Sequence, residues 1–320
     1  MNSRHPHLTS WIGALIWLGL VAVAAALAPA AALAPDLLHT SQPPFQAGHW
    51  WGTDAQGIDV GVAMLQGART LLLISLPASI GTILLAGIAG SVAGFTAHTA
   101  LRVPRAWVVA GGSVLCGLLL LAPSVLKQPI GWGGGLLLAG SLLGVVSHQT
   151  TWGQRSWTLP LDELITGGMN LLDSVPLLLL VLVAAAVQHP SPVGLVLLLV
   201  ITCWTTPARL LRATTLQVAQ QEYVTAARMA GLSTFRIARR HIWPNSRWVL
   251  LVRFPLTMAL LIGLETTLSF LGVGLPPDTP SWGRLLAGIR LAPEAWWLWA
   301  WPGTALALTI LSLHRLSSAK

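Results

Sequence analysis

The residues of this sequence that could do chemistry are few and far apart. Its nine histidines, at positions 5, 7, 39, 49, 98, 148, 189, 241 and 314, include no His-Glu-x-x-His pair or other metal-ligand spacing. Cys116 and Cys203, the only cysteines, both lie in apolar runs, which argues against a disulfide framework or a zinc site. A Gly-x-x-x-x-Gly-Lys-Ser/Thr phosphate loop is absent. We therefore expect no catalytic residue, no metal ligand and no cofactor bound by this chain.

One carboxylate, Glu265, lies deep in a long apolar run. An ionisable group inside a membrane is costly unless it faces the interior of a helix bundle or an aqueous cavity. Glu265, together with Ser269, is therefore a candidate for a translocation pathway. A structural hydrogen-bonding role between helices fits the sequence equally well.

The composition of the chain predicts a helical membrane protein. Of its 320 residues, 54% are apolar and 9% are charged, and the mean hydropathy is +0.70. A soluble domain carries about a quarter charged residues. The net charge of +8 comes from basic residues between apolar runs instead of one basic domain, so no nucleic-acid partner is expected.

Long apolar runs indicate about eight membrane spans. The first run is long enough to span, which favours an uncleaved helix over a signal peptide. The third and fourth are short, and the fourth begins with a glycine cluster, so a re-entrant pair is the alternative for these two. The runs are Trp11–Leu33, Leu71–Phe95, Ala106–Ser124, Ile130–Val146, Leu171–Val187, Val193–Ala213, Leu250–Val273 and Trp296–Leu313.

The distribution of arginine predicts the orientation of these spans. Seven arginines lie between Ala208 and Trp248, whereas Pro35 to Gly67 contains three aspartates and no Lys or Arg. Because cytoplasmic loops carry the excess of Lys and Arg, the arginine-rich segment is expected in the cytoplasm. Counting spans outward places both termini in the cytoplasm and residues 36–67 outside.

The arginine-rich segment reads as two short helices joined at a turn. Gly231 can take the left-handed conformation that ends the first helix, and Ser233 can cap the second. Pro244 is expected to stop the second helix. In that helix apolar Phe235, Ile237, Ala238 and Ile242 alternate with Arg236, Arg239 and Arg240, so one face can bury while the other stays charged. This pattern suits docking into another protein, and the alternative is a helix lying on anionic lipid.

The spacing in this segment resembles that of the inner-membrane permeases of bacterial ABC importers. Their loop has the pattern Glu-Ala-Ala, three residues, Gly, nine residues, Ile-x-Leu-Pro. Here Thr225-Ala226-Ala227, Gly231 and His241-Ile242-Trp243-Pro244 keep both spacings, with Thr225, His241 and Trp243 departing from the pattern. The flanking Glu222-Tyr223 and Asn245 resemble the dipeptide, oligopeptide and nickel type, in its C permease subunit branch.

The resemblance implies that this loop, at 214–248, is the coupling helix that sits in a cleft of a separate ATP-hydrolysing subunit. Thr225 stands where the family has its first glutamate, so this chain lacks that carboxylate. The residues implied in coupling are Glu222, Tyr223, Ala226, Ala227, Arg228, Gly231, Arg236, Arg240, His241, Pro244 and Asn245.

Two further segments are similar to the same branch. Before the second span, Gly52, Thr53, Asp54, Gly57 and Asp59 match an external signature of the family, although a polar outer loop made of turn residues would also explain them. Near the end, 264–274 and 276–283 match closely. Where the family has an Arg and an Asp before the third core span, this chain has Gly167 and Asn170, so local ion pairing there is expected to be absent.

The resemblance also implies an organisation. We expect an all-α membrane protein, with a six-helix ABC importer permease core and a two-segment hydrophobic insertion. The predicted parts are a transmembrane helix at 1–35, an external segment at 36–70, a second core span at 71–97, the insertion at 98–160 and the rest of the core at 161–320.

The function implied is that of a non-catalytic permease subunit in the bacterial inner membrane, forming half of the pathway for peptides, nickel complexes or a related small solute. Its implied partners are a second homologous permease, two ATPase subunits that hold ATP and Mg, an extracytoplasmic binding protein and the lipid bilayer. The alternatives are an ABC-type exporter, or an ion- or proton-coupled carrier that uses Glu265.

The span count predicts where the insertion turns. A reporter fused near Lys127, between the third and fourth apolar runs, is expected on the outer side of the membrane. Paired fusions of alkaline phosphatase and green fluorescent protein at this position would measure it, and a cytoplasmic signal would support a re-entrant pair instead.

Overall fold

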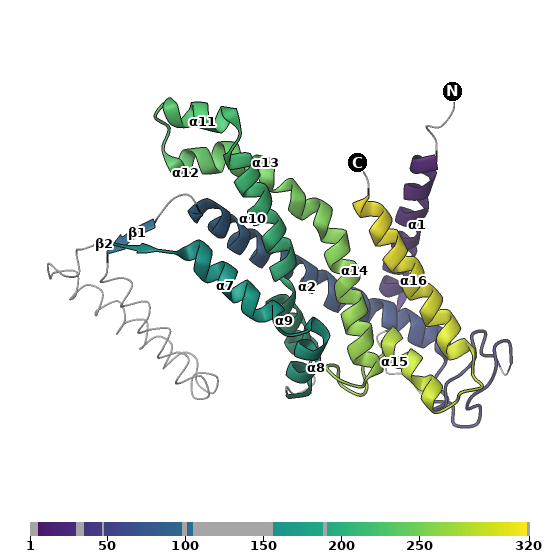
Figure 1. Ribbon diagram of the computed structural model, residues 1–320. Coiled ribbons are helices and arrows are strands. Elements are labelled where there is room, and N and C mark those ends of the chain that lie inside the picture. The colour runs from purple at the N-terminus through teal and green to yellow at the C-terminus, as the bar shows by residue number, and fades with distance from the viewer. Residues whose placement is uncertain are drawn as a thin grey trace. The chain divides into compact units, whose positions relative to one another are not determined.

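The computed structural model of the protein describes residues 6–29, 35–46, 48–97, 101–104, 156–187 and 191–318 (Figure 1). The chain divides into two compact units, one formed by Met1–Ser91 with Gly167–Lys320 and the other by Val92–Thr166. Regular structure in the described residues is helical apart from one two-stranded sheet. The predominantly helical fold predicted from the sequence is therefore confirmed.

The helices follow the predicted apolar runs, with some breaks. They are α1 (Pro6–Leu27), α2 (Val60–Thr96), α7 (Leu161–Asp173), α8 (Leu177–Val187), α9 (Pro192–Cys203), α10 (Thr205–Ala219), α11 (Glu222–Met229), α12 (Thr234–Ile237), the π-helix η1 (Ala238–Ile242), α13 (Trp243–Ser246), α14 (Trp248–Phe270), α15 (Trp282–Ala287), the 3₁₀-helix η2 (Gly288–Arg290) and α16 (Trp297–Ser317). The predicted external segment 36–70 thus ends in the first turns of α2.

A two-stranded antiparallel sheet was not predicted. Strand β1 (Leu101–Pro104) pairs with β2 (Ser156–Leu159), with Leu101 opposite Leu159. Four residues are too few for an alternating pattern to stand out in the sequence. The sheet lies at the two ends of the expected insertion and holds those ends together. The apolar runs 106–124 and 130–146 lie outside the described residues.

Three helical stretches of the described chain are long and apolar enough to cross a membrane: α2, α9 with α10, and α14. Helices α7 and α8 together are a fourth candidate, bent by 82° at a short break, and Trp11–Leu27 of α1 forms a shorter apolar helix. Helix α16 forms where a span was predicted but is not among the three. The total of eight spans stays a prediction.

Helix α14 is shared by two apolar clusters. The first joins it to α1, the start of α2, α15 and α16, through residues such as Met258, Ile262 and Leu298. The second joins it to the middle of α2, α8 and α9, through residues such as Leu199 and Leu261. Helix α14 therefore connects the two apolar clusters of the larger unit.

The larger unit has two distinct ends. Figure 1 shows α11 and α12 as a hairpin at one end, and the segment 35–59 near the starts of α15 and α16 at the other. The start of α1 and the end of α16 lie toward the end that carries the hairpin.

Helix α2 crosses α10 closely at Gly90. A Cβ atom at this position would lie 2.6 Å from Ala208 O and 3.0 Å from Leu211 Cβ. We predict that Gly90→Ala lowers the stability of the purified protein by about 1–3 kcal/mol, because backbone atoms cannot move aside. Gly263→Ala is the matched control, since a Cβ there meets nothing within 4 Å. Thermal unfolding in one detergent measures both, and equal midpoints would contradict the proposed contact.

Candidate functional site

The turn between α11 and α12 is built around Gly231. Its φ angle is +76°, a left-handed conformation that glycine adopts without strain. Gly231 N donates to Arg228 O at 3.0 Å and Leu232 N to Ala227 O at 3.3 Å, the bonding pattern of a Schellman helix end. The predicted role of Gly231 in ending the first helix is confirmed.

The start of the second helix differs in detail from the prediction. Ser233 occupies the N-cap position with an extended backbone, but its side chain makes no capping hydrogen bond. Its carbonyl instead accepts from Ile237 N at 3.0 Å, as in any first helical turn. The expected Ser233 cap is therefore wrong for the side chain and right for the position.

The prediction that Pro244 stops the second helix is wrong. The helix passes through a five-residue π-helical segment, η1, and Pro244 then lies in the first turn of α13, which leads into α14. Proline is tolerated in a first turn because its missing N–H would have no partner there. The wider π-helical turn accommodates the break in the α-helical ladder. The chain therefore runs without interruption from η1 through α13 into α14. We call α13, which leads into α14, the stem.

The hairpin formed by α11, α12 and η1 buries one face and exposes the other. Val224, Ala227, Ile237, Ala238 and Ile242 are buried, which confirms the expected apolar face except at Phe235. Phe235 is 76% exposed and Met229 is 85% exposed. Arg228, Arg236, Arg239 and Arg240 are also exposed, so the outward surface combines large apolar groups with cations.

A side-chain contact ties the hairpin to the stem. Asn245 Nδ2 donates to His241 O at 2.6 Å and to Tyr223 Oη at 3.3 Å. The rings of Tyr223 and His241 lie 6.4 Å apart, centroid to centroid. The structure therefore brings Tyr223, His241 and Asn245 together, while exposed Glu222 and Ala226 make no part of this contact.

Glu265 and Ser269 lie together inside the larger unit. Ser269 Oγ donates to Glu265 Oε1 at 2.8 Å, and Thr266 Oγ1 lies 3.5 Å from Glu265 Oε2. Glu265 is 1% exposed and Ser269 is 2% exposed. This enclosure favours the internal hydrogen-bonding role that the sequence left open for Glu265.

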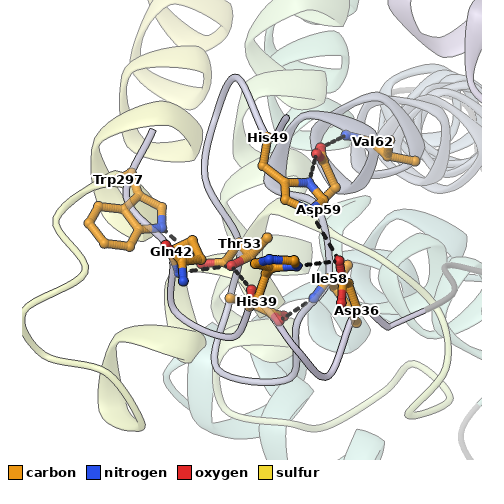
Figure 2. A network of polar contacts seen from close by, with 10 residues as sticks. Asp36, His39, Gln42, His49, Thr53, Ile58, Asp59, Val62 and Trp297 are labelled. Atoms are coloured by element: carbon orange, nitrogen blue, oxygen red, sulfur yellow. Dashed lines mark hydrogen bonds and ion pairs between the residues drawn. The ribbon is translucent and has the colours of Figure 1, made fainter. Parts of the chain in front are cut away.

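The external signature residues form a compact loop (Figure 2). Thr53 is fully buried, and its carbonyl accepts from Trp297 Nε1 at 3.0 Å, which ties the loop to α16. Asp54 Oδ1 accepts from Gln56 N and Ile58 N, both at 2.8 Å, and burial raises the pKa of Asp54 despite these bonds. Gly52 and Gly57 have φ angles of +83° and +78°. These residues therefore fix the backbone conformation of the loop and its contact with α16.

A network of histidines and aspartates that the sequence did not predict holds this loop to α2 (Figure 2). His49 Nδ1 donates to Asp59 Oδ2 at 2.6 Å, and Asp59 Oδ1 accepts from Val62 N at 3.0 Å in the first turn of α2. His49 Nε2 lies 3.7 Å from Asp36 Oδ2, which also accepts from His39 Nδ1 at 2.8 Å. Among the described residues no group of three or more His, Cys, Asp or Glu is arranged to hold a metal ion.

An ion pair joins α7 to α10 beside Asn170, one of the two positions at which the family's own local pair is replaced. Arg209 Nη2 lies 2.7 Å from Asp173 Oδ2 and 2.9 Å from Asn170 Oδ1. Asp173 follows Asn170 by three residues, so it presents its carboxylate about one helical turn later. The sequence alone does not indicate this pair, because Asp173 and Arg209 lie on different helices, 36 residues apart.

Long apolar helices able to cross a membrane, with an exposed basic hairpin between two of them, are the features of a multi-pass membrane protein. The family of binding-protein-dependent transport system inner membrane components matches residues 138–317, more than half of the 320 residues. The chain belongs to this family.

Its relatives carry the names of peptide permeases. A protein of Brucella suis biovar 1 (strain 1330), named as a peptide transport system permease, is 34% identical over 178 residues, 55% of this chain and 57% of that protein. The oligopeptide transport system permease protein OppC of Bacillus subtilis (strain 168) is 26% identical over 280 residues, 87% of this chain and 72% of its own length. The chain thus spans little more than half the length of the Brucella relative.

The network around His49 predicts a pH-dependent stability. The hydrogen bond to Asp59 raises the pKa of His49, and the hydrogen bond from His39 lowers the pKa of Asp36. A raised histidine pKa gives stability that is complete below the unfolded value of about 6.5 and is lost as pH rises through the folded value. His49→Gln should therefore lower the unfolding midpoint more at about pH 6 than at about pH 9. A midpoint difference independent of pH would contradict this.

Proposed function

We propose that this chain is the membrane-spanning permease subunit of an ATP-driven importer and forms half of its translocation pathway. Membership in the binding-protein-dependent transport family supports import over export. The names of its relatives support peptides as the transported solutes, ahead of nickel complexes. The proposal gives this chain no catalytic role.

The observation that carries the proposal is the exposed hairpin at one end of the larger unit. Met229 and Phe235 project from it and are mostly exposed, next to a cluster of arginines. Large apolar groups in water are costly unless a partner covers them. We assign this surface to the coupling helix, seated in a cleft of an ATPase subunit.

The remaining partners follow from the same assignment. The sequence has no phosphate loop, so two ATPase subunits would bind ATP and Mg and supply the energy. A second homologous permease would complete the pathway, and an extracytoplasmic binding protein would deliver the solute. We propose that the protein lies in the bacterial inner membrane with both termini in the cytoplasm. The start of α1 and the end of α16, which lie toward the end that carries the arginine-rich hairpin, support this orientation (Figure 1).

A proton-coupled carrier that uses Glu265 receives less support. A proton carrier needs access to water from alternate sides, and Glu265 is 1% exposed with both of its oxygens near hydroxyl groups. Transport without any ATPase partner would revive this alternative.

Coupling can be tested at Gly231. Gly231→Val should leave the protein in the membrane but detach or uncouple the ATPase, because a β-branched residue strains the φ of +76° that closes the hairpin. Gly231→Asn is the matched control, since asparagine tolerates this conformation far better. Co-purification of the ATPase and solute-stimulated ATP hydrolysis measure the effect. Unchanged values in the valine variant would show that the hairpin is not the coupling element.

A further inference from the structure

A polar cluster joins α7 to α10. Arg209 Nη2 donates to Asp173 Oδ2 at 2.7 Å and to Asn170 Oδ1 at 2.9 Å, and Thr205 Oγ1 donates to Asp173 Oδ1 at 2.8 Å. Thr205 is buried and supports Asp173 from within the protein. The charged side chains are open on the other side: that of Arg209 is 41% exposed and that of Asp173 is 44% exposed.

The cluster lies at a break in a candidate span. Helix α7 ends at Asp173, α8 begins at Leu177, and their axes differ by 82°. The connecting residues Ser174, Val175 and Pro176 are all exposed. Backbone that is not helical is tolerated at membrane depth only where protein covers it or where it lines a water-filled cavity. The residues that the structure describes leave the break uncovered.

The two observations concern the same surface, because Asp173 of the ion pair is the last residue of α7 before the break. A half-exposed ion pair and an open helix break are both unfavourable against lipid. We propose that Asn170, Asp173 and Arg209 line the wall of the translocation pathway. This inference rests on the proposed transport function and gives that pathway a location in this chain.

The chemistry of the cluster suits a small solute with both charged and polar groups, such as a peptide. Arg209 offers donors and Asp173 offers acceptors, while the pair as a whole is neutral, so neither end of a zwitterion would be held strongly. Helix α10 continues into α11 through Gln220 and Gln221 alone. A displacement of the hairpin would therefore move Arg209 relative to Asp173.

Cysteine accessibility in the assembled transporter tests the location. In a chain with Cys116 and Cys203 replaced by serine, Asn170→Cys should react with a membrane-impermeant methanethiosulfonate several-fold faster in one nucleotide state than in the other. Glu163→Cys, exposed near the start of the same helix, is the matched control for a surface that is always open. Ser269→Cys, 2% exposed, is the control for an enclosed site and should react in neither state.

Two outcomes would overturn the inference. Equal reaction of Asn170→Cys in both nucleotide states, as at Glu163→Cys, would place α7 on an open aqueous surface. No reaction in either state would mean that lipid or the second permease covers the face. If the wild-type chain binds no ATPase, the proposed function fails instead.

The ion pair itself gives a second test. Asp173→Asn and Arg209→Gln should each reduce peptide uptake by reconstituted complexes about tenfold or more, because each leaves one charge unpaired. The double variant should recover part of that loss. Co-purification of the ATPase should be unchanged in all three. Single variants that transport at the wild-type rate would overturn the inference.

Discussion

Because the core of a bilayer contains no water, only some surfaces of this protein can lie against lipid. An ionised side chain or an unpaired backbone group is costly against hydrocarbon, so every such group must be enclosed, paired or turned toward water. Glu265 is enclosed, and its carboxylate accepts hydrogen bonds from the hydroxyl groups of Ser269 and Thr266. Asp173 and Arg209 are paired yet half exposed. The arginines of the hairpin lie between the candidate spans that end at Ala219 and begin at Trp248.

This constraint separates two kinds of buried polar residue that look alike in a sequence. Glu265 stood out because it lies deep in an apolar run, but the packing of α14 against α15 encloses it. Asp173 lies only two residues after the start of the predicted run at Leu171, so its position in the sequence does not mark it as unusual. Depth in an apolar run therefore predicts the cost of a charge, whereas exposure in the folded chain indicates which charges can meet a solute.

Sequence reasoning succeeded where one residue type has one local consequence. Gly231 ends α11 in the left-handed conformation, and the spacing of Ile237, Ala238 and Ile242 predicts the buried face. It failed where the consequence depends on neighbours. Pro244 starts a helical turn because η1 precedes it, and His49 joins Asp36 to Asp59 only after the loop has folded. The pairing of β1 with β2 depends on a contact across the whole insertion.

The hairpin is connected to α10, which carries Arg209, and to α14, which carries Glu265. Ile237 and Ile242 are buried at its base, and Asn245 links it to the stem that continues into α14. On its other side, two residues separate α11 from α10. Because α10 and α14 also pack against each other, a force on the hairpin acts on both helices together. Under the proposed coupling, a force on the hairpin would reach Arg209 directly through α10, whereas α14 is held by its packing in both apolar clusters.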